Sequence, residues 1–440
     1  MTAEAGRGTS TSASTGTGTG TGTRRLADVD ALRGFALLGI LLVNIPFFAS
    51  GYTLPGVADP ARTAWHDGVA SGLIQFVFEA KFYLLFSFLF GYSFTLQLDS
   101  AAARGVGFRP RFLRRLGALF LIGVANAALL YYGDILITYA LFGLLLFLMR
   151  GISPRRALWV AGIITGVFVL LFLALATAVA LFDGSSSPTA AEHAKMLADG
   201  RAATEAMRGG PWSVIADRVS ELTTTLPLTI FIQGPLAFSA MLVGLAAGKL
   251  RVLADRGADP AAYGRKLRTI QWIGFPVGLA GSAFYTFAST DNLFAGGLHF
   301  LTAPFLTAAY VATLLRFFRT VRGGRVAEAL ARPGRMALTN YLSQSLLCVL
   351  IFTGTGLGLI GRVPYAGVIG IALAIYSVQL LWSAWWLRRF RMGPVEWLLR
   401  AATYLERPAM RVRRQEGADG GSGGGSGTGA EARSEATRSA

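Results

Sequence analysis

The sequence predicts an all-α fold, a polytopic membrane helix bundle of about ten transmembrane helices with both termini in the cytoplasm. Of its 440 residues, 53% are hydrophobic and only 15% are charged, a balance that ordinary soluble domains do not show. Apolar stretches of about 17 to 25 residues recur, the length that a helix needs to cross roughly 30 Å of hydrocarbon. The ten stretches lie near 31–50, 76–98, 115–131, 134–149, 156–182, 227–248, 269–288, 297–315, 337–360 and 366–387.

The distribution of basic residues predicts the orientation of these helices. The chain carries 41 Lys and Arg against 24 Asp and Glu, a formal net charge of +17. Most of the cations fall in alternate connections, on the side that also holds both termini. Cytoplasmic loops of membrane proteins are enriched in Lys and Arg. We therefore expect a multi-pass plasma-membrane protein with both ends in the cytoplasm, and we assign the charge to topology rather than to a nucleic-acid partner.

Composition also divides the chain into parts. Both ends are rich in Gly, Ser and Thr and contain too little apolar surface to offset the entropy of ordering them. The segment GPVEWLLRAATYLERP, with Trp397 and Tyr404 suited to the headgroup level, predicts a helix on the membrane surface. The expected parts are a disordered tail over 1–23, a transmembrane domain over 24–407 with an outer loop at 183–226 and a cytoplasmic interfacial helix at 393–406, and a basic, then Gly/Ser-rich, disordered tail over 408–440.

Several protein classes are excluded by what the sequence lacks. Cys348 is the only cysteine, so no intrachain disulfide framework can form. The three histidines, His66, His193 and His299, are scattered, and we expect no metal site. No GxSxG, HExxH or P-loop pattern stands in a suitable setting. We also expect no permanently bound cofactor.

Polar side chains near or inside the apolar stretches are the candidate functional residues, because a bilayer disfavours them unless a partner or a function keeps them there. Glu79 and Lys81 are two residues apart and share no helical face, so we expect each to pair with another element. The amides have a structural alternative, since Asn and Gln commonly join membrane helices by hydrogen bonds. The candidates are Asp30, Arg33, Asn44, Glu79, Lys81, Asn126, Asp134, His299, Asn340 and Gln344.

Five motifs follow one another along the chain. They are RLADVDALRG at 25–34 running into LLGILLVN, KF at 81–82 followed by LFSFLFG, GDIL at 133–136 with YALFG, GRMALTNYLSQSLL at 334–347, and RRFRMGPVEWLLRAATY at 388–404. Together they resemble the YeiB-like family, domain of unknown function 418, over residues 24–407. One position departs from the family pattern. The family usually has a histidine where this chain has Asn126, so a titratable base is missing there.

The opening motif is also similar to that of the heparan-alpha-glucosaminide N-acetyltransferases. Those transmembrane enzymes take an acyl group from cytoplasmic acyl-CoA and deliver it to an acceptor across the membrane. The resemblance implies catalytic roles for Asn44, at the outer end of the first span, and for His66, which follows it. A neutral His66 can accept a proton from the acceptor, while the Asn44 amide can stabilise developing charge. The arginines that can bind the CoA phosphates are Arg25, Arg33, Arg114 and Arg115.

Two functions therefore follow from the sequence. The first is an acyltransferase with acyl-CoA as co-substrate and an unknown small-molecule, lipid or glycan acceptor. The alternative is a transporter or flippase-like protein without acyl chemistry, indicated by the many spans, by helix-breaking Pro235 and Pro276, and by the charges of Glu79 and Lys81. The lipid bilayer is an expected partner in both cases, and a homodimer is left open.

Overall fold

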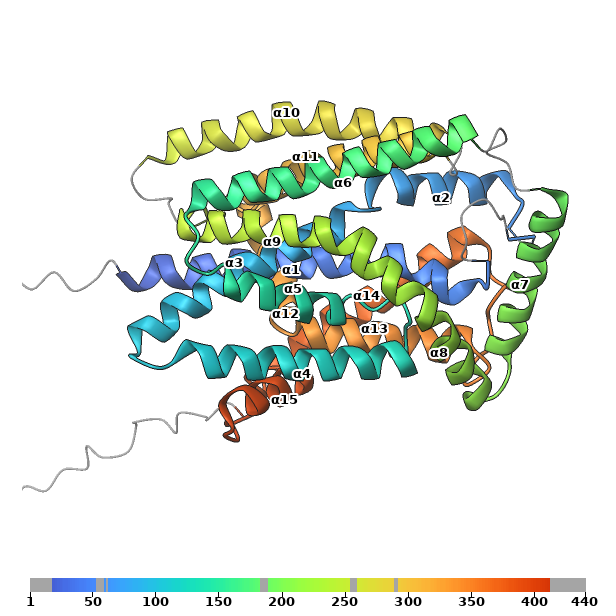
Figure 1. The fold of residues 1–440 in the computed structure, drawn as a ribbon. Helices are drawn as coiled ribbons and strands as arrows, with labels where there is room; N and C mark the ends of the chain where they lie inside the picture. The colour runs from blue at the N-terminus through green and yellow to red at the C-terminus, as the bar shows by residue number, and fades with distance from the viewer. Residues whose placement is uncertain are drawn as a thin grey trace, which may run out of the picture.

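The computed structural model of the chain describes residues 18–52, 59–60, 62–182, 189–253, 259–288 and 292–411, with side chains described from Leu26 onwards. The regular elements in this part of the chain are helices, and most of them run lengthwise through one bundle (Figure 1). In chain order they are α1 (Gly18–Ala49), α2 (Trp65–Val77), α3 (Lys81–Ala103), α4 (Phe108–Leu129), α5 (Leu136–Leu148), α6 (Pro154–Phe182), α7 (Ala190–Arg208), α8 (Pro211–Leu228), the π-helix η1 (Thr229–Gln233), α9 (Gly234–Lys249), α10 (Pro260–Phe287), α11 (Leu293–Phe317), α12 (Val321–Arg335), α13 (Ala337–Phe352), α14 (Tyr365–Leu387) and α15 (Pro394–Tyr404).

The apolar helices confirm a polytopic helical membrane protein. Seven spans in the described chain are long and apolar enough to cross a bilayer, and α12 with α13 makes an eighth if these bent halves form one span. Each of the ten stretches expected from the sequence overlaps a helix. However, α5 has only 13 residues, and α10 is not among the seven although it has 28. By length and composition, the structure supports seven or eight spans.

Two spans are broken rather than straight. The sequence leaves open whether one helix runs through Glu79, and the structure shows that α2 ends at Val77 and α3 begins at Lys81. Ala80 in this break has a positive φ of 64°, which ends the helical path. The second break lies between α12 and α13, whose axes differ by 75°. Breaks at membrane depth are tolerated where surrounding protein satisfies the freed backbone groups.

Helix α1 crosses α12 at very short range because two glycines lie at the contact. A Cβ atom at Gly34 would overlap the carbonyl oxygen of Leu330, and one at Gly334 would overlap that of Asp30. Close approach of membrane helices through small residues is a common way to pack them. This crossing fixes the start of α13 beside α1.

Gly34→Ala is expected to lower the free energy of unfolding by about 1 to 3 kcal/mol, because a methyl group there meets a backbone carbonyl that cannot rotate away. Thermal unfolding in detergent, followed by intrinsic fluorescence, measures the change. Gly324→Ala, on α12 itself, is the matched control, since a Cβ there would lie 3.9 Å from the nearest atom, the carbonyl oxygen of Phe318. Equal unfolding midpoints for Gly34→Ala and Gly324→Ala would contradict the close crossing.

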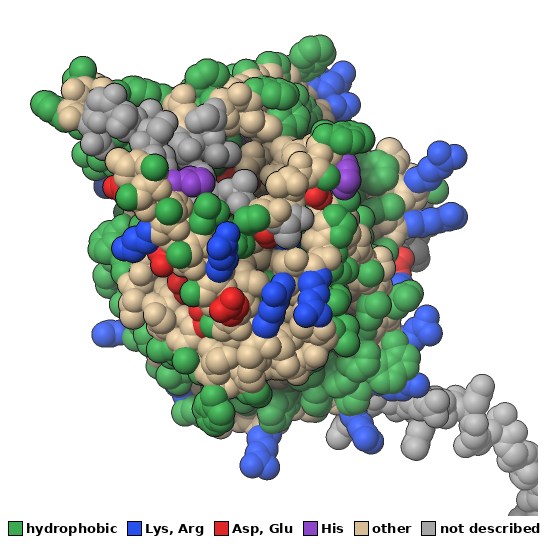
Figure 2. Space-filling model, turned by 90° about the vertical axis from the view of Figure 1, so that its right-hand side faces the viewer, with side chains coloured by type: hydrophobic (Ala, Val, Ile, Leu, Met, Phe, Trp, Pro, Cys, Tyr) green, Lys and Arg blue, Asp and Glu red, His purple; other side chains and the backbone are tan. Residues whose placement is uncertain are grey.

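The two ends of the bundle differ. The start of α1, the connection between α3 and α4, and helix α15 lie toward one end, here named the α15 end, whereas α7 lies across the opposite end, the α7 end (Figure 1). At the α7 end, charged side chains of both signs lie on the face while apolar side chains cover much of its margin (Figure 2). The bundle therefore has a polar end and an apolar circumference, as expected for a membrane protein.

The predicted tails and loops are partly helical. Helix α1 begins at Gly18, inside the segment predicted as a tail, because extending a helix costs far less than starting one. Most of the expected outer loop belongs to α7 and α8, and Thr189 with Glu192 forms a capping box at the start of α7. A helix, α15, is present where the sequence predicts an interfacial one. The remainder of the predicted tails, 1–17 and 412–440, lies outside the described residues.

Candidate functional site

A cavity of about 200 Å³ lies between α1, α3, α4, α5, α13 and α15, with the end of α12 in its wall. On α1 the wall changes from Arg33 to Ile40, seven residues or roughly 10 Å deeper along the helix. The same change occurs on α3, from Gln97 to Phe86. The polar side chains are Arg33, Ser93, Gln97, Arg115, Arg335 and Glu396, and the others include Ile40, Phe86, Leu89, Phe90, Leu119, Ile135, Leu136, Tyr139 and Tyr341. The cavity is thus basic toward the α15 end and apolar and aromatic inside.

Arg33 is held in place from two sides. Its Nη1 atom lies 2.6 Å from Oδ1 of Asp30, one turn earlier on α1, and its Nη2 atom donates to the hydroxyl of Ser93 on α3. Asp30 therefore contributes to this region by fixing Arg33, and it does not itself line the cavity. The pair leaves the guanidinium in the wall with its orientation set before any ligand arrives.

Two further arginines, Arg115 and Arg335, line the same region. Within the described residues neither forms an ion pair, and Arg335 donates only a long hydrogen bond, 3.4 Å, to the carbonyl of Arg391. The carboxylate in this wall, Glu396, is already bonded to the start of α13, where the backbone N–H groups of Leu338 and Thr339 donate to its Oε1 at 2.7 and 3.0 Å. Positive charge therefore predominates in this wall.

Tyr341 closes the inner part of the cavity. Its hydroxyl donates to Oδ1 of Asp134 at 3.0 Å, and the same oxygen accepts from Nδ2 of Asn126 at 2.8 Å. The backbone N–H groups of Leu136 and Ile137 donate to the other carboxylate oxygen at 2.8 and 3.3 Å. Asn126 and Asp134, both predicted as candidates, are therefore brought together, with Tyr341 as their link to the cavity.

A second, much smaller void is also lined by Tyr341. Its volume is about 10 Å³, and its wall includes Asn44, Gln344 and Cys348 as well as Tyr341. Tyr341 lines both spaces, so the void that holds Asn44 and the basic cavity have this residue in common. The predicted candidate Asn44 is thus placed next to the cavity rather than in it.

His66 does not join Asn44 in a common site. It is exposed in the first turn of α2, where its ring contacts Trp65, and it lines neither cavity. The reason is helical periodicity, because the buried face of α2 includes Asp67 and Ile74, so the residue before Asp67 points away from the bundle. The predicted pairing of Asn44 with His66 is therefore not assembled in this structure.

The other arginines predicted to bind phosphate differ in whether they line the cavity. Arg115 lies in the cavity wall beside Arg33, whereas its neighbour Arg114 is outside it and donates to the carbonyl of Pro110 at 3.1 Å. The side chain of Arg25 lies outside the described residues. One of two adjacent arginines on α4 therefore faces the cavity and the other does not.

Asn340 and Gln344 mainly join helices. Gln344 donates to the side-chain oxygen of Gln379 on α14 at 2.9 Å, and Gln379 donates to the backbone carbonyl of Asn340 at 2.8 Å. Asn340 donates to Ser383, also on α14, at 3.1 Å. This is the structural alternative predicted for the amides of this segment.

The charges at the break between α2 and α3 pair with other groups, as the sequence predicts. Lys81 is fully buried, and its ammonium donates to the carbonyls of Gln75 and Phe76, both at 3.1 Å, at the negative end of the α2 dipole. Tyr285 of α10 donates to Oε1 of Glu79 at 3.2 Å. His299 of α11 stacks on the Tyr285 ring, with centroids 4.5 Å apart. This group of residues does not line the cavity described above.

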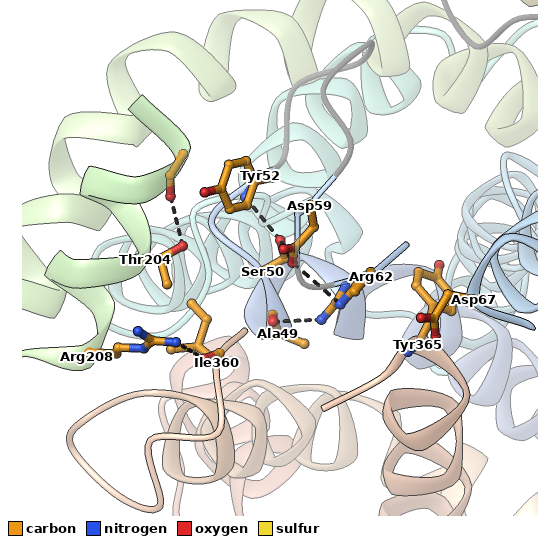
Figure 3. Close-up of polar contacts among 11 residues, drawn as sticks. Ala49, Ser50, Tyr52, Asp59, Arg62, Asp67, Thr204, Arg208, Ile360 and Tyr365 are labelled. Atoms are coloured by element: carbon orange, nitrogen blue, oxygen red, sulfur yellow. Dashed lines mark hydrogen bonds and ion pairs between the residues drawn. The ribbon is translucent and has the colours of Figure 1, made fainter. Parts of the chain in front are cut away.

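A network of polar contacts closes the α7 end (Figure 3). Arg62 donates to the carbonyl of Ala49 at 2.7 Å and forms an ion pair with Asp59 at 3.6 Å, and Asp59 accepts from the hydroxyl of Ser50 at 2.7 Å. Burial lowers the pKa of Arg62 below its ordinary value, and the Asp59 carboxylate opposes that change. These contacts fix the chain that leaves α1.

Two more contacts of Figure 3 tie other helix ends to this network. Asp67 of α2 accepts from the backbone N–H of Tyr365, at the start of α14, at 2.6 Å. Arg208, at the end of α7, donates to the carbonyl of Ile360 at 3.0 Å. These contacts thus join the ends of α1, α2, α7 and α14, and we assign them a structural role.

Sequence reasoning missed Arg335, Glu396, Tyr139 and Tyr341 as members of the site. Three of them stand inside motifs that carry the family resemblance, GRMALTNYLSQSLL and RRFRMGPVEWLLRAATY, and the fourth follows GDIL in the YALFG segment. The family motifs therefore already contained all four residues. Their place in one cavity depends on the bend between α12 and α13 and on the docking of α15, which no local pattern gives.

The fold and this cavity define a polytopic helical membrane protein with a cavity that is basic toward one end and apolar inside. Residues 248–406 match the family model described as a protein of unknown function, DUF418. The chain is 34% identical to the uncharacterized protein YxaH of Bacillus subtilis (strain 168), with 87% of this chain and 94% of that protein covered. It is 31% identical to an uncharacterized 39.9 kDa protein of Bacillus acidopullulyticus, with 86% and 94% covered, and 29% identical to the uncharacterized protein YeiB of Escherichia coli (strain K12), with 86% and 96% covered. The chain belongs to the YeiB-like family.

Proposed function

We propose that the protein is a plasma-membrane acyltransferase that takes an acyl group from cytoplasmic acyl-CoA and delivers it to an acceptor in the membrane or on its outer side. The observation that carries the proposal is the cavity, with arginines toward the α15 end, an apolar wall, and Tyr341 next to the void of Asn44. An acyl-CoA has its parts in a matching order, with phosphates at one end, then a long thin arm, then the thioester.

The phosphates would bind Arg33, Arg115 and Arg335. Guanidinium groups donate two parallel hydrogen bonds to phosphate, and such charge-assisted bonds are among the strongest in proteins. Arg115 and Arg335 have no carboxylate partner in the described chain, so their charge is available to a ligand. The excess of Lys and Arg in the connections on the side of both termini supports a cytoplasmic location for the α15 end.

The acceptor would react near Tyr341 and Asn44. Because His66 lies elsewhere, the Tyr341 and Asp134 pair takes the role of the base. The oxygen or nitrogen of the acceptor attacks the thioester carbon while its proton passes to the Tyr341 oxygen and the phenolic proton passes to Asp134. The carbon–sulfur bond then breaks, the proton returns to the CoA sulfur, and the Asn44 amide stabilises the charge on the carbonyl oxygen.

Ligand-induced stabilisation tests the proposal. Acetyl-CoA, longer acyl-CoAs, free CoA and ATP are titrated against the detergent-solubilised protein while the unfolding midpoint is followed, because a ligand that binds only the folded state raises it. We expect a saturable rise with the CoA thioesters and a smaller one with ATP, which lacks the arm. Folded protein that no thioester stabilises, and that hydrolyses none, would overturn the proposal.

A transporter or flippase-like function without acyl chemistry remains the second candidate, supported by the bend between α12 and α13, the break between α2 and α3, and the buried Lys81. Discontinuous membrane helices often form substrate or ion sites in transporters. Substrate movement across vesicles that stops in Glu79→Gln, from a protein with no detectable acyl transfer, would favour this function over the first.

A further inference from the structure

The break between α2 and α3 brings a carboxylate, a phenol and an imidazole together inside the bundle, apart from the cavity. Tyr285 contacts both other groups. Its hydroxyl donates to Glu79 at 3.2 Å, and its ring lies almost parallel to that of His299, with an interplanar angle of 21°. The three residues come from the break, from α10 and from α11, so only the folded bundle assembles them.

Only 2% of the His299 surface is exposed, and the backbone of Glu79 is the one hydrogen-bonding group near its ring among the described residues, at a geometry too poor for a well-formed bond. A neutral imidazole carries one donor and one acceptor nitrogen. Buried polar groups in native proteins nearly always have partners. The Glu79 backbone carbonyl can accept from the donor nitrogen, so it is the acceptor nitrogen of the imidazole that lacks a donor among the described residues.

The groups around Glu79 offset only part of the negative charge of its carboxylate. Lys81 is the nearby cation, but its ammonium donates to two carbonyls of α2 and forms no ion pair with Glu79 in the described chain. The other titratable groups near the carboxylate are the histidine and several tyrosines, namely Tyr83 of α3, Tyr285 of α10, His299 and Tyr310 of α11, and Tyr365 of α14. Among the described residues, Tyr285 is the side-chain donor to this carboxylate, and a charged carboxylate inside a bilayer is costly, so protonation would remove an unfavourable charge.

We propose that this cluster reversibly binds a proton, held on the Glu79 carboxylate and donated toward His299. A proton from water joins one carboxylate oxygen and gives a carboxylic acid. No bond of the chain breaks, and the cluster gains one positive charge. The acid is a hydrogen-bond donor, which the carboxylate is not, so protonation supplies the partner that an imidazole nitrogen lacks.

The site is independent of the acyl-CoA cavity. It lies at a broken span, where Lys81 and the hydroxyl of Tyr310 bind the last carbonyls of α2. A change of charge at this break therefore acts directly on the joint between two half-helices. Such a joint is an arrangement through which proton binding can be coupled to helix movement.

Nuclear magnetic resonance of the full chain with isotope-labelled histidine gives a direct test. The chain has three histidines, and His66 and His193 are exposed, so their signals serve as internal references. Loss of a signal in His299→Asn assigns the third. We expect the His299 signal to move in one step as the pH falls, and this step to be absent in Glu79→Gln while the other two histidines are unchanged. A His299 signal that is constant in the wild type, or that moves identically in Glu79→Gln, overturns the proposal.

Infrared difference spectra observe the carboxyl group itself. On acidification the wild type should gain a protonated-carboxyl band together with the His299 step, and Glu79→Gln should lose this band. Tyr285→Phe keeps the stacked ring but removes the donor to the carboxylate, so the band should form at a higher pH. Glu205→Gln, which removes an exposed carboxylate of α7, is the matched control and should retain the band. An unchanged band in Glu79→Gln overturns the proposal.

Discussion

Arg33→Ala is expected to weaken the binding of acetyl-CoA by about tenfold to a hundredfold, the effect of losing charge-assisted hydrogen bonds worth roughly 1.5 to 3 kcal/mol. The guanidinium is fixed in the cavity wall by Asp30 and Ser93, so a phosphate meets donors that are already oriented. The dissociation constant follows from the rise of the unfolding midpoint with ligand concentration. Arg115→Ala should show a loss of similar size.

Arg114→Ala is the matched control for this experiment. Arg114 is adjacent to Arg115 on α4 and carries the same charge, but its side chain lies outside the cavity. It should bind acetyl-CoA as the wild type does, which separates a specific site from a general effect of positive charge. Because Arg33 also bonds to α3, the unfolding midpoint without ligand shows whether Arg33→Ala is still folded. Equal affinity in folded Arg33→Ala and the wild type would remove the arginine site from the proposal.

Asp134→Ala is expected to destabilise the protein by about 3 to 5 kcal/mol, because its partners would keep buried hydrogen-bonding groups without acceptors. Four donors converge on this carboxylate: the side chains of Asn126 and Tyr341, and the backbone N–H groups of Leu136 and Ile137. The measurement is the unfolding midpoint in detergent, with loss of soluble folded protein as the extreme result.

The control replaces a carboxylate that is exposed. Glu328 pairs with Arg332 on the surface of α12 at 2.8 Å, and exposed pairs contribute at most about 1 kcal/mol. Glu328→Ala should therefore unfold close to the wild-type midpoint. If Asp134→Ala were as stable as Glu328→Ala, the network around Asp134 would have no structural importance, and its proposed part in proton transfer would need a different basis.

The sequence predicts the fold well because length and hydropathy act locally. Each apolar stretch overlaps a helix, since burying unpaired backbone groups in lipid leaves few alternatives to helix formation. The number of complete spans is harder to predict. A break such as that at Ala80 requires a positive φ and partners for the freed carbonyls, and some of these partners come from α11, more than two hundred residues away.

The site could be predicted only in part, for a similar reason. Arg33 and Arg115 follow from basic residues next to apolar spans, but Arg335 reaches the same cavity because α12 bends sharply into α13. The resemblance gives the place of His66 in the chain and not its position around α2, where the residue beside it is the buried one, so its catalytic role stays a prediction. Spacing along a helix decides which neighbour faces inward, and a sequence motif alone does not contain that information when the start of the helix is unknown.

The bonds between Glu396 and the first N–H groups of α13 have a consequence for biogenesis. Helix α15 follows all the transmembrane helices in the chain, yet it supplies Glu396 and Leu399 to the cavity wall. Domains form in order of synthesis, N-terminal parts first. A nascent chain that has inserted α1 to α14 therefore still has an open cavity wall and an uncapped α13, and the cavity is completed only when the ribosome has released the segment around residue 400.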